Sequence, residues 1–209
     1  MSAALIFLAS ALSAPQITPS FARRIQEYYP QWALNENAQT ASTVEFTVLP
    51  SGVVANCRVL ESVGSERLAA EACAEAVGLK LTPAIDGAGV PAFGLLRMGV
   101  SLTLSAPGVR RLEPFVATPD VELEVNRLPD GKDQLNLEVA LLVSPEGRTS
   151  GCEGRTVDDT PPPEAYVRVA CEQAKEWRST ILQDAAGTAV PYITNFRARF
   201  NRSVAAAGG

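Results

Sequence analysis

The sequence predicts an α+β protein made of two small β-β-α-β units, each a short antiparallel sheet packed on one helix. Three observations lead to this prediction. Apolar residues alternate in runs that flank Pro- and Gly-containing turns, which is typical of β-hairpins. The spacing of apolar residues then changes to that of an amphipathic helix. The whole pattern occurs twice along the 209 residues, and such an internal repeat indicates two structural units.

In the first copy, apolar residues alternate over 44–48, a Pro-Ser-Gly turn follows at 50–52, and strand-like sequence resumes over 53–60. This arrangement predicts a β-hairpin. A helix is expected over 65–77, because its apolar residues recur at helical spacing. Its apolar face carries Leu68, Ala72, Cys73 and Ala76. Residues 94–104 are rich in branched side chains and predict the third strand of this copy.

The second copy repeats these elements. "VLPSGVVANC" (48–57) aligns with "VSPEGRTSGC" (143–152), and residues 72–89 align with 170–187 without a gap. The predicted hairpin spans 135–152, the prolines at 161–163 lead into the helix, and "YITNFRARF" (192–200) is the last strand. Each copy therefore contains the same order of expected elements.

The boundaries of the two units follow from this alignment. We expect the first unit at 28–105 and the second at 120–204, joined by a linker at 106–119 that contains three prolines and no periodicity. Residues 15–27 form an N-terminal segment. "VELEVNRLPDGKD" (121–133) is either an extra strand or a turn that leads into the second hairpin.

Residues 1–14 are predicted to be a signal peptide. Residues 3–14 are almost wholly apolar or small. As a helix these twelve residues would span roughly 18 Å, too short for a hydrocarbon core of about 30 Å. Ala9-Ser10-Ala11 or Leu12-Ser13-Ala14 would be the cleavage site, although no basic residue occurs before Arg23. A fraying helix or a core segment is the alternative, and no integral membrane anchor is expected.

The composition restricts the function. Hydrophobic residues make up 46% and charged residues 20%, as in folded soluble proteins. A formal net charge of -5 disfavours a nucleic-acid partner, because phosphate binding needs a dense basic surface. The sequence contains no histidine, which is the commonest general base and a common zinc ligand. We therefore expect no catalytic residues, no metal site and no cofactor.

The four cysteines, Cys57, Cys73, Cys152 and Cys171, allow two interpretations. Each copy has one cysteine in a strand and one in a helix, which favours the disulfides Cys57–Cys73 and Cys152–Cys171 in an oxidising compartment. Each disulfide would close a loop of about 15 residues and stabilise the fold by about 3 kcal/mol. Four buried free cysteines in a cytosolic protein are the alternative.

The first copy also resembles a known family. Tyr29-Pro30 is followed by Ala33, and Pro83-Ala84 and Gly89-Val90-Pro91 precede the final strand. Between them lies a run of matching positions at Val44, Phe46, Val48, Gly52, Val54, Val59, Ser62, Gly64 and Leu68. In order and spacing, residues 28–104 resemble the C-terminal domain of the energy-transducing protein TonB. The second copy resembles the family less well, since it has no Tyr-Pro at its start and has an insertion at 158–163.

The resemblance implies a periplasmic interaction module. Domains of this family bind outer-membrane TonB-dependent receptors by accepting a short receptor segment as an added strand along the last strand of the sheet. The resemblance therefore implies partner-binding positions in the strand at 94–104, namely Leu95, Arg97, Gly99 and Ser101. TonB proper also has a membrane-spanning helix and a long Pro-rich spacer, which are not recognisable in this sequence. The implied role is thus binding of a receptor or another envelope protein, accessory to TonB-dependent transport.

Several other residues and functions allow more than one interpretation from the sequence. The aromatic stretch at 28–32, with Tyr29 and Pro30, is either a receptor contact or a patch that packs on the sheet. Leu96, Met98, Val100 and Leu102 are expected to face the core, opposite the binding positions. Arg197, Arg199 and Arg202 form a solvated strand face or an anionic-ligand site, and Asp158 and Asp159 are expected to be solvated loop charges. A homodimer, a hydrolase with its site between the copies, and a structural envelope protein are the remaining possibilities.

Overall fold

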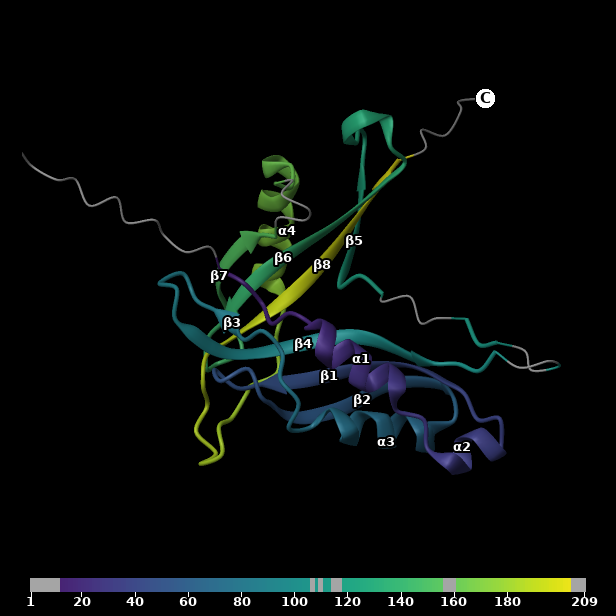
Figure 1. Cartoon of the computed structure of the whole chain (residues 1–209). Helices are drawn as coiled ribbons and strands as arrows, with labels where there is room; N and C mark the ends of the chain where they lie inside the picture. The colour runs from purple at the N-terminus through teal and green to yellow at the C-terminus, as the bar shows by residue number, and fades with distance from the viewer. Residues whose placement is uncertain (1–11, 106–107, 109–110, 114–117, 156–160, 204–209) are drawn as a thin grey trace, which may run out of the picture.

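The computed structural model describes residues 12–105, 108, 111–113, 118–155 and 161–203. These residues form a mixed α+β fold with one eight-stranded sheet, and the predicted α+β class is confirmed. Figure 1 shows the first half of the chain below and the second half above, with β4 and β8 adjacent where the halves meet.

The first half has the predicted order of strands and helix. Its elements are β1 (Thr40–Val48), β2 (Val54–Gly64), α3 (Glu66–Ala76), a short β3 (Ala84–Ile85) and β4 (Pro91–Leu102). Ser65 caps α3, because its side chain accepts a hydrogen bond of 3.2 Å from the N–H of Leu68. Strand β1 pairs antiparallel with β2 on one side and with β4 on the other, so it is central in this half.

Two helices that the sequence analysis did not predict precede β1. They are α1 (Pro19–Glu27) and α2 (Gln31–Asn35). The side chain of Thr18 accepts a hydrogen bond from the N–H of Phe21, and proline at the first helical position is favourable there. The Phe21 ring packs edge-to-face on Phe46 at 5.4 Å. The apolar face of α1 therefore extends the core of the first half.

The second half contains the same hairpin, helix and final strand. Its elements are β5 (Val121–Val125), the 3-10 helix η1 (Pro129–Gly131), β6 (Gln134–Val143), β7 (Thr149–Gly154), α4 (Glu164–Glu176) and β8 (Tyr192–Arg202). Residues 121–133, for which the sequence allowed either a strand or a turn, contain both a strand, β5, and the turn formed by η1. Strand β5 pairs in parallel with the end of β8.

The strands of both halves belong to a single sheet with the order β2-β1-β4-β8-β6-β7. Residues 93–95 of β4 pair in parallel with residues 192–194 of β8. The expectation of two separate sheets is therefore not confirmed. The pairing of β4 with β8 is made by main-chain N–H and C=O groups, which every strand edge has. The pattern of side chains in the sequence therefore could not predict this pairing.

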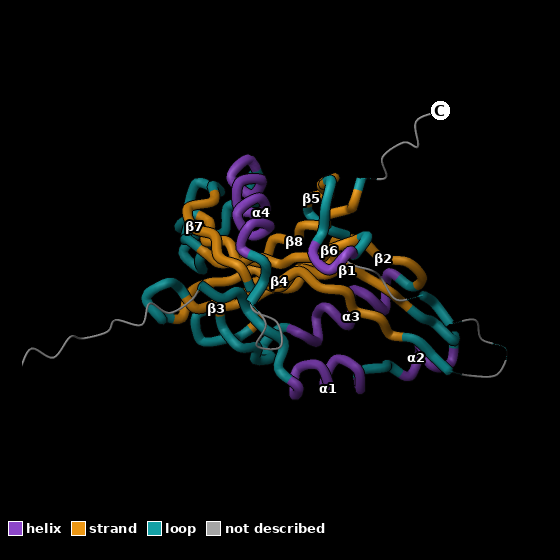
Figure 2. Tube along the Cα trace, turned by 90° about the horizontal axis from the view of Figure 1, so that it is seen from above, coloured by secondary structure: helices purple, strands orange, loops and turns teal. Residues whose placement is uncertain are grey.

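Helices α3 and α4 lie on opposite faces of this sheet (Figure 2). Leu96 packs into the cluster under α1 and α3, together with Phe46 and Leu68. Its neighbour Leu95 packs into the cluster under α4, together with Phe196. Consecutive residues of a strand point to opposite faces, so β4 contributes to both cores.

A third cluster joins the halves at the start of the described chain. Leu12 and Ala14, which are 8% and 6% exposed, pack against Ala84, Ala140 and Ile193. Leu12 and Ala14, which lie within the predicted signal peptide, are thus buried in the folded protein. Residues 1–11 lie outside the described residues.

The neighbouring Pro15 contacts the sheet at Gly94. A Cβ atom added to Gly94 would overlap the ring of Pro15. Glycine at this position therefore allows the N-terminal segment to approach β4 closely.

Both expected disulfides are present. Cys57 of β2 is bonded to Cys73 of α3, and Cys152 of β7 is bonded to Cys171 of α4, with Cα–Cα distances of 5.5 and 5.7 Å. Each disulfide joins the outer strand of a hairpin to the helix that covers it. The helices bury mainly alanine and contribute little apolar area, so each disulfide adds a covalent link to a thin core.

The turns of the two halves also correspond. Gly52 and Gly147 both have positive φ, 81° and 75°, and each accepts a hydrogen bond from the chain after the helix, from Leu81 and Ser179 respectively. The side chain of Asp86 accepts hydrogen bonds from the N–H groups of residues 88 and 90, and Asp184 does the same for residues 186 and 188. These contacts match the sequence alignment of the two copies.

Candidate functional site

Strand β4, the expected binding strand, is not an edge strand along its whole length. β1 lies on one side of residues 94–102, and β8 covers the other side at residues 93–95. Leu95 therefore pairs with Thr194, and its side chain is buried in the second core. This position disfavours the predicted role of Leu95 in partner binding, because the second half of the chain already covers it. From Leu96 to Leu102, no described strand pairs with the outer side of β4.

The orientation of the main chain along this open stretch can be derived from one contact. The side chain of Arg197 donates a hydrogen bond of 2.5 Å to the carbonyl of Arg97, so the main-chain groups of Arg97 point away from β1. Because these groups alternate along a strand, those of Gly99 and Ser101 point the same way. Both residues are exposed. We call the outer side of β4 at residues 96–102 the β4 edge.

The side chains of β4 alternate as predicted. Leu96, Val100 and Leu102 are buried in the first core and Met98 packs against it. Arg97, Gly99 and Ser101 lie on the opposite face. The structure therefore brings these three predicted site residues together at the β4 edge.

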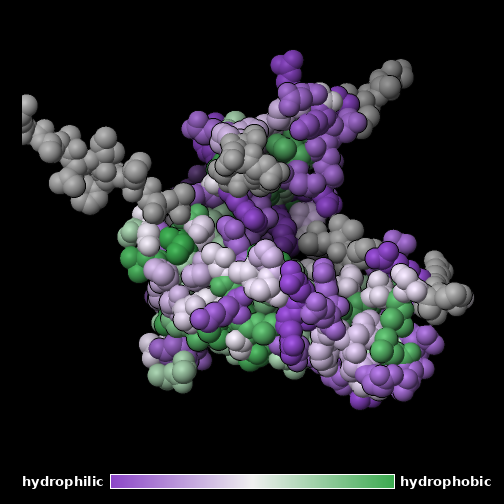
Figure 3. Space-filling view, in the orientation of Figure 1, coloured by the Kyte–Doolittle hydropathy of each residue, from purple (hydrophilic) through white to green (hydrophobic). Residues whose placement is uncertain are grey.

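An ion-pair network occupies the end of the β4 edge that lies nearest β8. Arg97 lies 3.2 Å from both Glu45 of β1 and Asp120, and Glu45 also pairs with Arg58 at 2.8 Å. Glu45 is only 8% exposed, and these two arginines are its ion-pair partners. On the face shown in Figure 3, hydrophilic residues line the recess between the two halves.

Asp120 links this network to the second half. One oxygen of its carboxylate contacts Arg97, and the other accepts a hydrogen bond of 2.8 Å from the N–H of Arg197. Burial raises the pKa of Asp120 above its ordinary value, although the Arg197 N–H and the charges of both arginines act in the opposite direction. Sequence analysis missed Glu45 and Asp120, because only the pairing of β4 with β1 and β8 brings them to Arg97.

Tyr29 and Pro30 lie on the other face of the sheet from Arg97, Gly99 and Ser101. The hydroxyl of Tyr29 donates to the carbonyl of Ala38, its ring packs against the first core, and Pro30 precedes α2. Both residues border a shallow cavity of about 300 Å³ between α1 and α3. The structure does not join them to the β4 edge.

The rest of the aromatic stretch anchors α2 to α3. The indole N–H of Trp32 donates to Glu71 at 2.8 Å, and the guanidinium of Arg67 lies 3.9 Å from the centre of the Trp32 ring. The hydrogen bond from Trp32 holds the pKa of Glu71 below its ordinary value, and the contacts with Arg67 act in the same direction to a smaller extent. Burial and the neighbouring Glu71 raise the pKa of Tyr28. These contacts show residues 28–32 packed on the protein itself.

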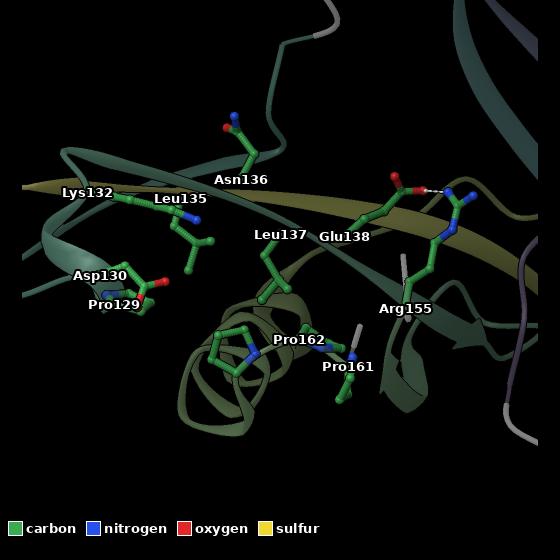
Figure 4. A pocket seen from close by; sticks show the side chains of 11 residues that line it. Pro129, Asp130, Lys132, Leu135, Asn136, Leu137, Glu138, Arg155, Pro161 and Pro162 are labelled. Carbon is green, nitrogen blue, oxygen red and sulfur yellow. Dashed lines mark hydrogen bonds and ion pairs between the residues drawn. The ribbon is translucent and has the colours of Figure 1, made fainter. Parts of the chain in front are cut away.

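A second open edge occurs on β6. Strand β7 pairs only with residues 139–143 of β6, whereas β2 pairs along the whole of β1. The N–H of Arg155 donates to the carbonyl of Glu138, so the main-chain groups of Asn136, two residues away, also point outward. Figure 4 shows the adjoining groove of about 290 Å³, which is lined on one side by Leu135 and Leu137. Prolines of η1 and of the segment before α4 also line it, together with polar and charged side chains: Pro129, Pro161, Pro162 and Pro163, and Asp130, Lys132, Asn136, Glu138 and Arg155.

The basic residues of β8 have partners within the protein. Arg199 pairs with Glu122 at 3.0 Å, Arg202 pairs with Asp133, and Arg197 contacts the Arg97 carbonyl. These contacts disfavour an anionic-ligand site on this strand. Asp158 and Asp159 lie outside the described residues.

In the part of the chain that the structure describes, no group of three or more acidic or cysteine residues is placed to hold a metal ion. Among the same residues, no helix has the length and apolar character needed to cross a membrane.

Comparison with known proteins finds a family match within the first half. The family model of the Gram-negative bacterial TonB protein C-terminal matches residues 25–93. This part of the chain is therefore similar to the TonB C-terminal domain. The match begins three residues before the expected boundary and covers β1, β2, α3 and β3. The TonB C-terminal family consists of non-enzymatic domains that bind proteins of the cell envelope.

The chain was also compared with solved structures and with curated proteins. The NMR solution structure of the Helicobacter pylori TonB C-terminal domain (residues 179–285) is 21% identical and covers 43% of this chain and 86% of that one, with a TM-score of 0.31. A score this low does not establish a shared arrangement of the whole chain. No curated protein matches the chain. The TonB C-terminal match ends at Phe93, the first residue of β4 that pairs with β8.

Proposed function

We propose that this protein is a periplasmic TonB-like interaction module, accessory to TonB-dependent transport. It binds an extended segment of an outer-membrane TonB-dependent receptor or of another envelope protein. The segment adds as a strand along the β4 edge. The family match at residues 25–93 supports the class of function. The outward main-chain groups of Gly99 and Ser101 are the observation that supports this mode of binding.

The chemistry of the β4 edge suits main-chain recognition. Gly99 presents no side chain, and Ser101 has a small polar one, so an incoming strand can approach closely. The side chain of Arg197 already donates a hydrogen bond to the carbonyl of Arg97. This contact limits one end of the stretch of β4 that can pair with a partner strand. Binding therefore depends mainly on hydrogen bonds from two residues, and a short segment is sufficient.

The second half is proposed to be a divergent copy of the same domain. The equivalent disulfides and the matching turns at Gly52 and Gly147 support this proposal. Limited proteolysis should cut first within 106–119 and leave both halves intact. Cleavage inside a half before the linker would contradict the proposed boundaries at 28–105 and 120–204.

The decisive experiment measures the affinity of the full chain for N-terminal peptides of outer-membrane receptors. Ser101→Pro removes an outward N–H without breaking a hydrogen bond to β1, and should weaken binding by about tenfold or more. Ser101→Ala keeps the N–H and should bind like wild type. Circular dichroism of all variants checks that they are folded.

A third variant tests the alternative edge. Asn136→Pro removes an outward N–H from β6 and should leave peptide binding unchanged. If Asn136→Pro loses binding while folded Ser101→Pro binds with wild-type affinity, the binding site is the β6 groove and not the β4 edge. Binding of no receptor peptide by any form would refute the receptor role itself. Size-exclusion chromatography of the same samples shows whether the protein forms a homodimer.

A further inference from the structure

The N-terminal end of the described chain is held in place like a short strand. The N–H of Ser13 donates to the carbonyl of Ile85 at 2.9 Å, and the N–H of Ile85 donates back to Ser13 at 2.9 Å. Gln16 and Thr82 form an equivalent pair of hydrogen bonds at 3.1 and 3.0 Å. Together with the burial of Leu12 and Ala14, these bonds make residues 12–16 part of the folded protein.

The main-chain nitrogen of Leu12 has an acidic partner. It donates a hydrogen bond of 2.7 Å to a carboxylate oxygen of Glu153, a residue of β7 in the second half. Leu12 also borders a cavity of about 180 Å³ together with Asn195. The side-chain oxygen of Asn195 is buried and accepts no hydrogen bond from the described residues. This nitrogen therefore lies beside a negative charge and near an unused acceptor.

The two candidate cleavage motifs differ in their small residues and in how many contacts of residues 12–14 a cut would remove. Signal-peptide cleavage needs small residues at the first and third positions before the cut. Ala9-Ser10-Ala11 has alanine at both, whereas Leu12-Ser13-Ala14 has leucine at the third position. A cut after Ala14 would also remove two buried side chains and both Ser13 hydrogen bonds. A cut after Ala11 would remove none of these contacts.

We propose that an envelope endopeptidase cleaves this chain between Ala11 and Leu12, and that the new N-terminus forms an ion pair with Glu153. Water hydrolyses the Ala11–Leu12 amide bond, which leaves a carboxylate on Ala11 and an ammonium group on Leu12. The ammonium keeps a donor for Glu153 and gains a positive charge and additional N–H donors. Processing thus strengthens a contact between the N-terminus and the second half.

The test is to express the full chain in a Gram-negative host and to determine the N-terminus and intact mass of the periplasmic protein. The expected product begins at Leu12. A product that begins at Pro15, or that retains residues before Leu12, overturns the proposal. Ala11→Glu should abolish this product, whereas Ser10→Glu, at the position between the two small residues, should still yield it. Persistence of the Leu12 product in Ala11→Glu would also contradict the proposed site.

A second measurement tests the ion pair. Glu153→Gln should lower the melting temperature of the processed protein by about 1–3 °C, a modest shift because Glu153 is exposed. The same substitution should have a smaller effect on protein made with residues 1–11 retained, in which Leu12 offers a neutral amide. Equal effects in the two forms would refute the ion pair.

Discussion

The guanidinium of Arg97 lies 3.2 Å from the carboxylate of Asp120, and this contact links the last strand of the first half to the residue that precedes the first strand of the second. Arg97 also pairs with the buried Glu45, so one guanidinium contacts two carboxylates from different parts of the chain. The network therefore contributes to the junction between the halves as well as to the β4 edge.

Replacing Arg97 by methionine should destabilise the protein by about 1–2 kcal/mol. The loss leaves Glu45 with only Arg58 and removes the ion pair of Asp120 with Arg97. Partial exposure of Arg97 keeps the cost below that of a fully buried pair. Urea denaturation measures the change. Arg58→Met, at the more exposed end of the network, is the matched control and should cost less than about 1 kcal/mol. A larger effect at Arg58 would contradict the central role of Arg97.

Asp120 should make stability fall with rising pH in the mildly acidic range. Its pKa is raised in the folded state, so the folded protein binds this proton more tightly than the unfolded chain. The contribution of Asp120 is then most favourable below the ordinary aspartate pKa of about 3.9 and declines as pH rises through the folded-state value. Asp120→Asn should remove this slope.

The measurement is the free energy of unfolding of wild type and Asp120→Asn across the acidic range. The stability of wild type relative to the variant should decrease as pH increases above about 4. A relative stability that increases over this range would mean that the arginines outweigh burial at this site.

Removing either disulfide should cost about 2–5 kcal/mol. The cysteine pairs are separated by 16 and 19 residues, so the two Cys→Ala double variants should lose similar amounts of stability. Denaturation of the variants and peptide mapping of the non-reduced protein check this prediction. Crossed links between the halves in native protein would rule out the pairing described above.

Gly94→Ala should destabilise the protein by about 1–3 kcal/mol, because the added methyl group overlaps the ring of Pro15 and would displace the N-terminal segment. Gly87→Ala is the control, since a Cβ atom there meets no neighbour within 4 Å. Thermal unfolding of both variants tests the prediction. Equal melting temperatures would show that residues 12–16 do not pack on β4.

Local patterns predicted the elements well. Alternation placed the hairpins and the core-facing side chains of β4, helical spacing placed α3 and α4, and the paired positions of the cysteines gave the disulfides. The parallel contact of β4 with β8 was not predictable in this way, because main-chain groups make it and carry no sequence signature. The same contact covers Leu95, which the sequence pattern therefore could not indicate.

The ends of the elements were harder to predict. Helix α1 was missed although Thr18 and Pro19 are typical of a helix start. The segment at 12–14 was assigned to a signal peptide because small and apolar residues suit an export signal and a packed core equally well. The β6 groove was not anticipated, since its open edge depends on where β7 ends.

The burial of Leu95 and of residues 12–14 by strands from the second half also has a consequence for the timing of folding. Ile193 lies far from Leu12 in the sequence, and until the second half has folded the segment at 12–14 has no complete surface to pack on. Helix α3 and its hairpin can form early, because their contacts are local. The N-terminal segment can therefore pack only at the end of folding, so residues 12–16 are among the last to reach their final position.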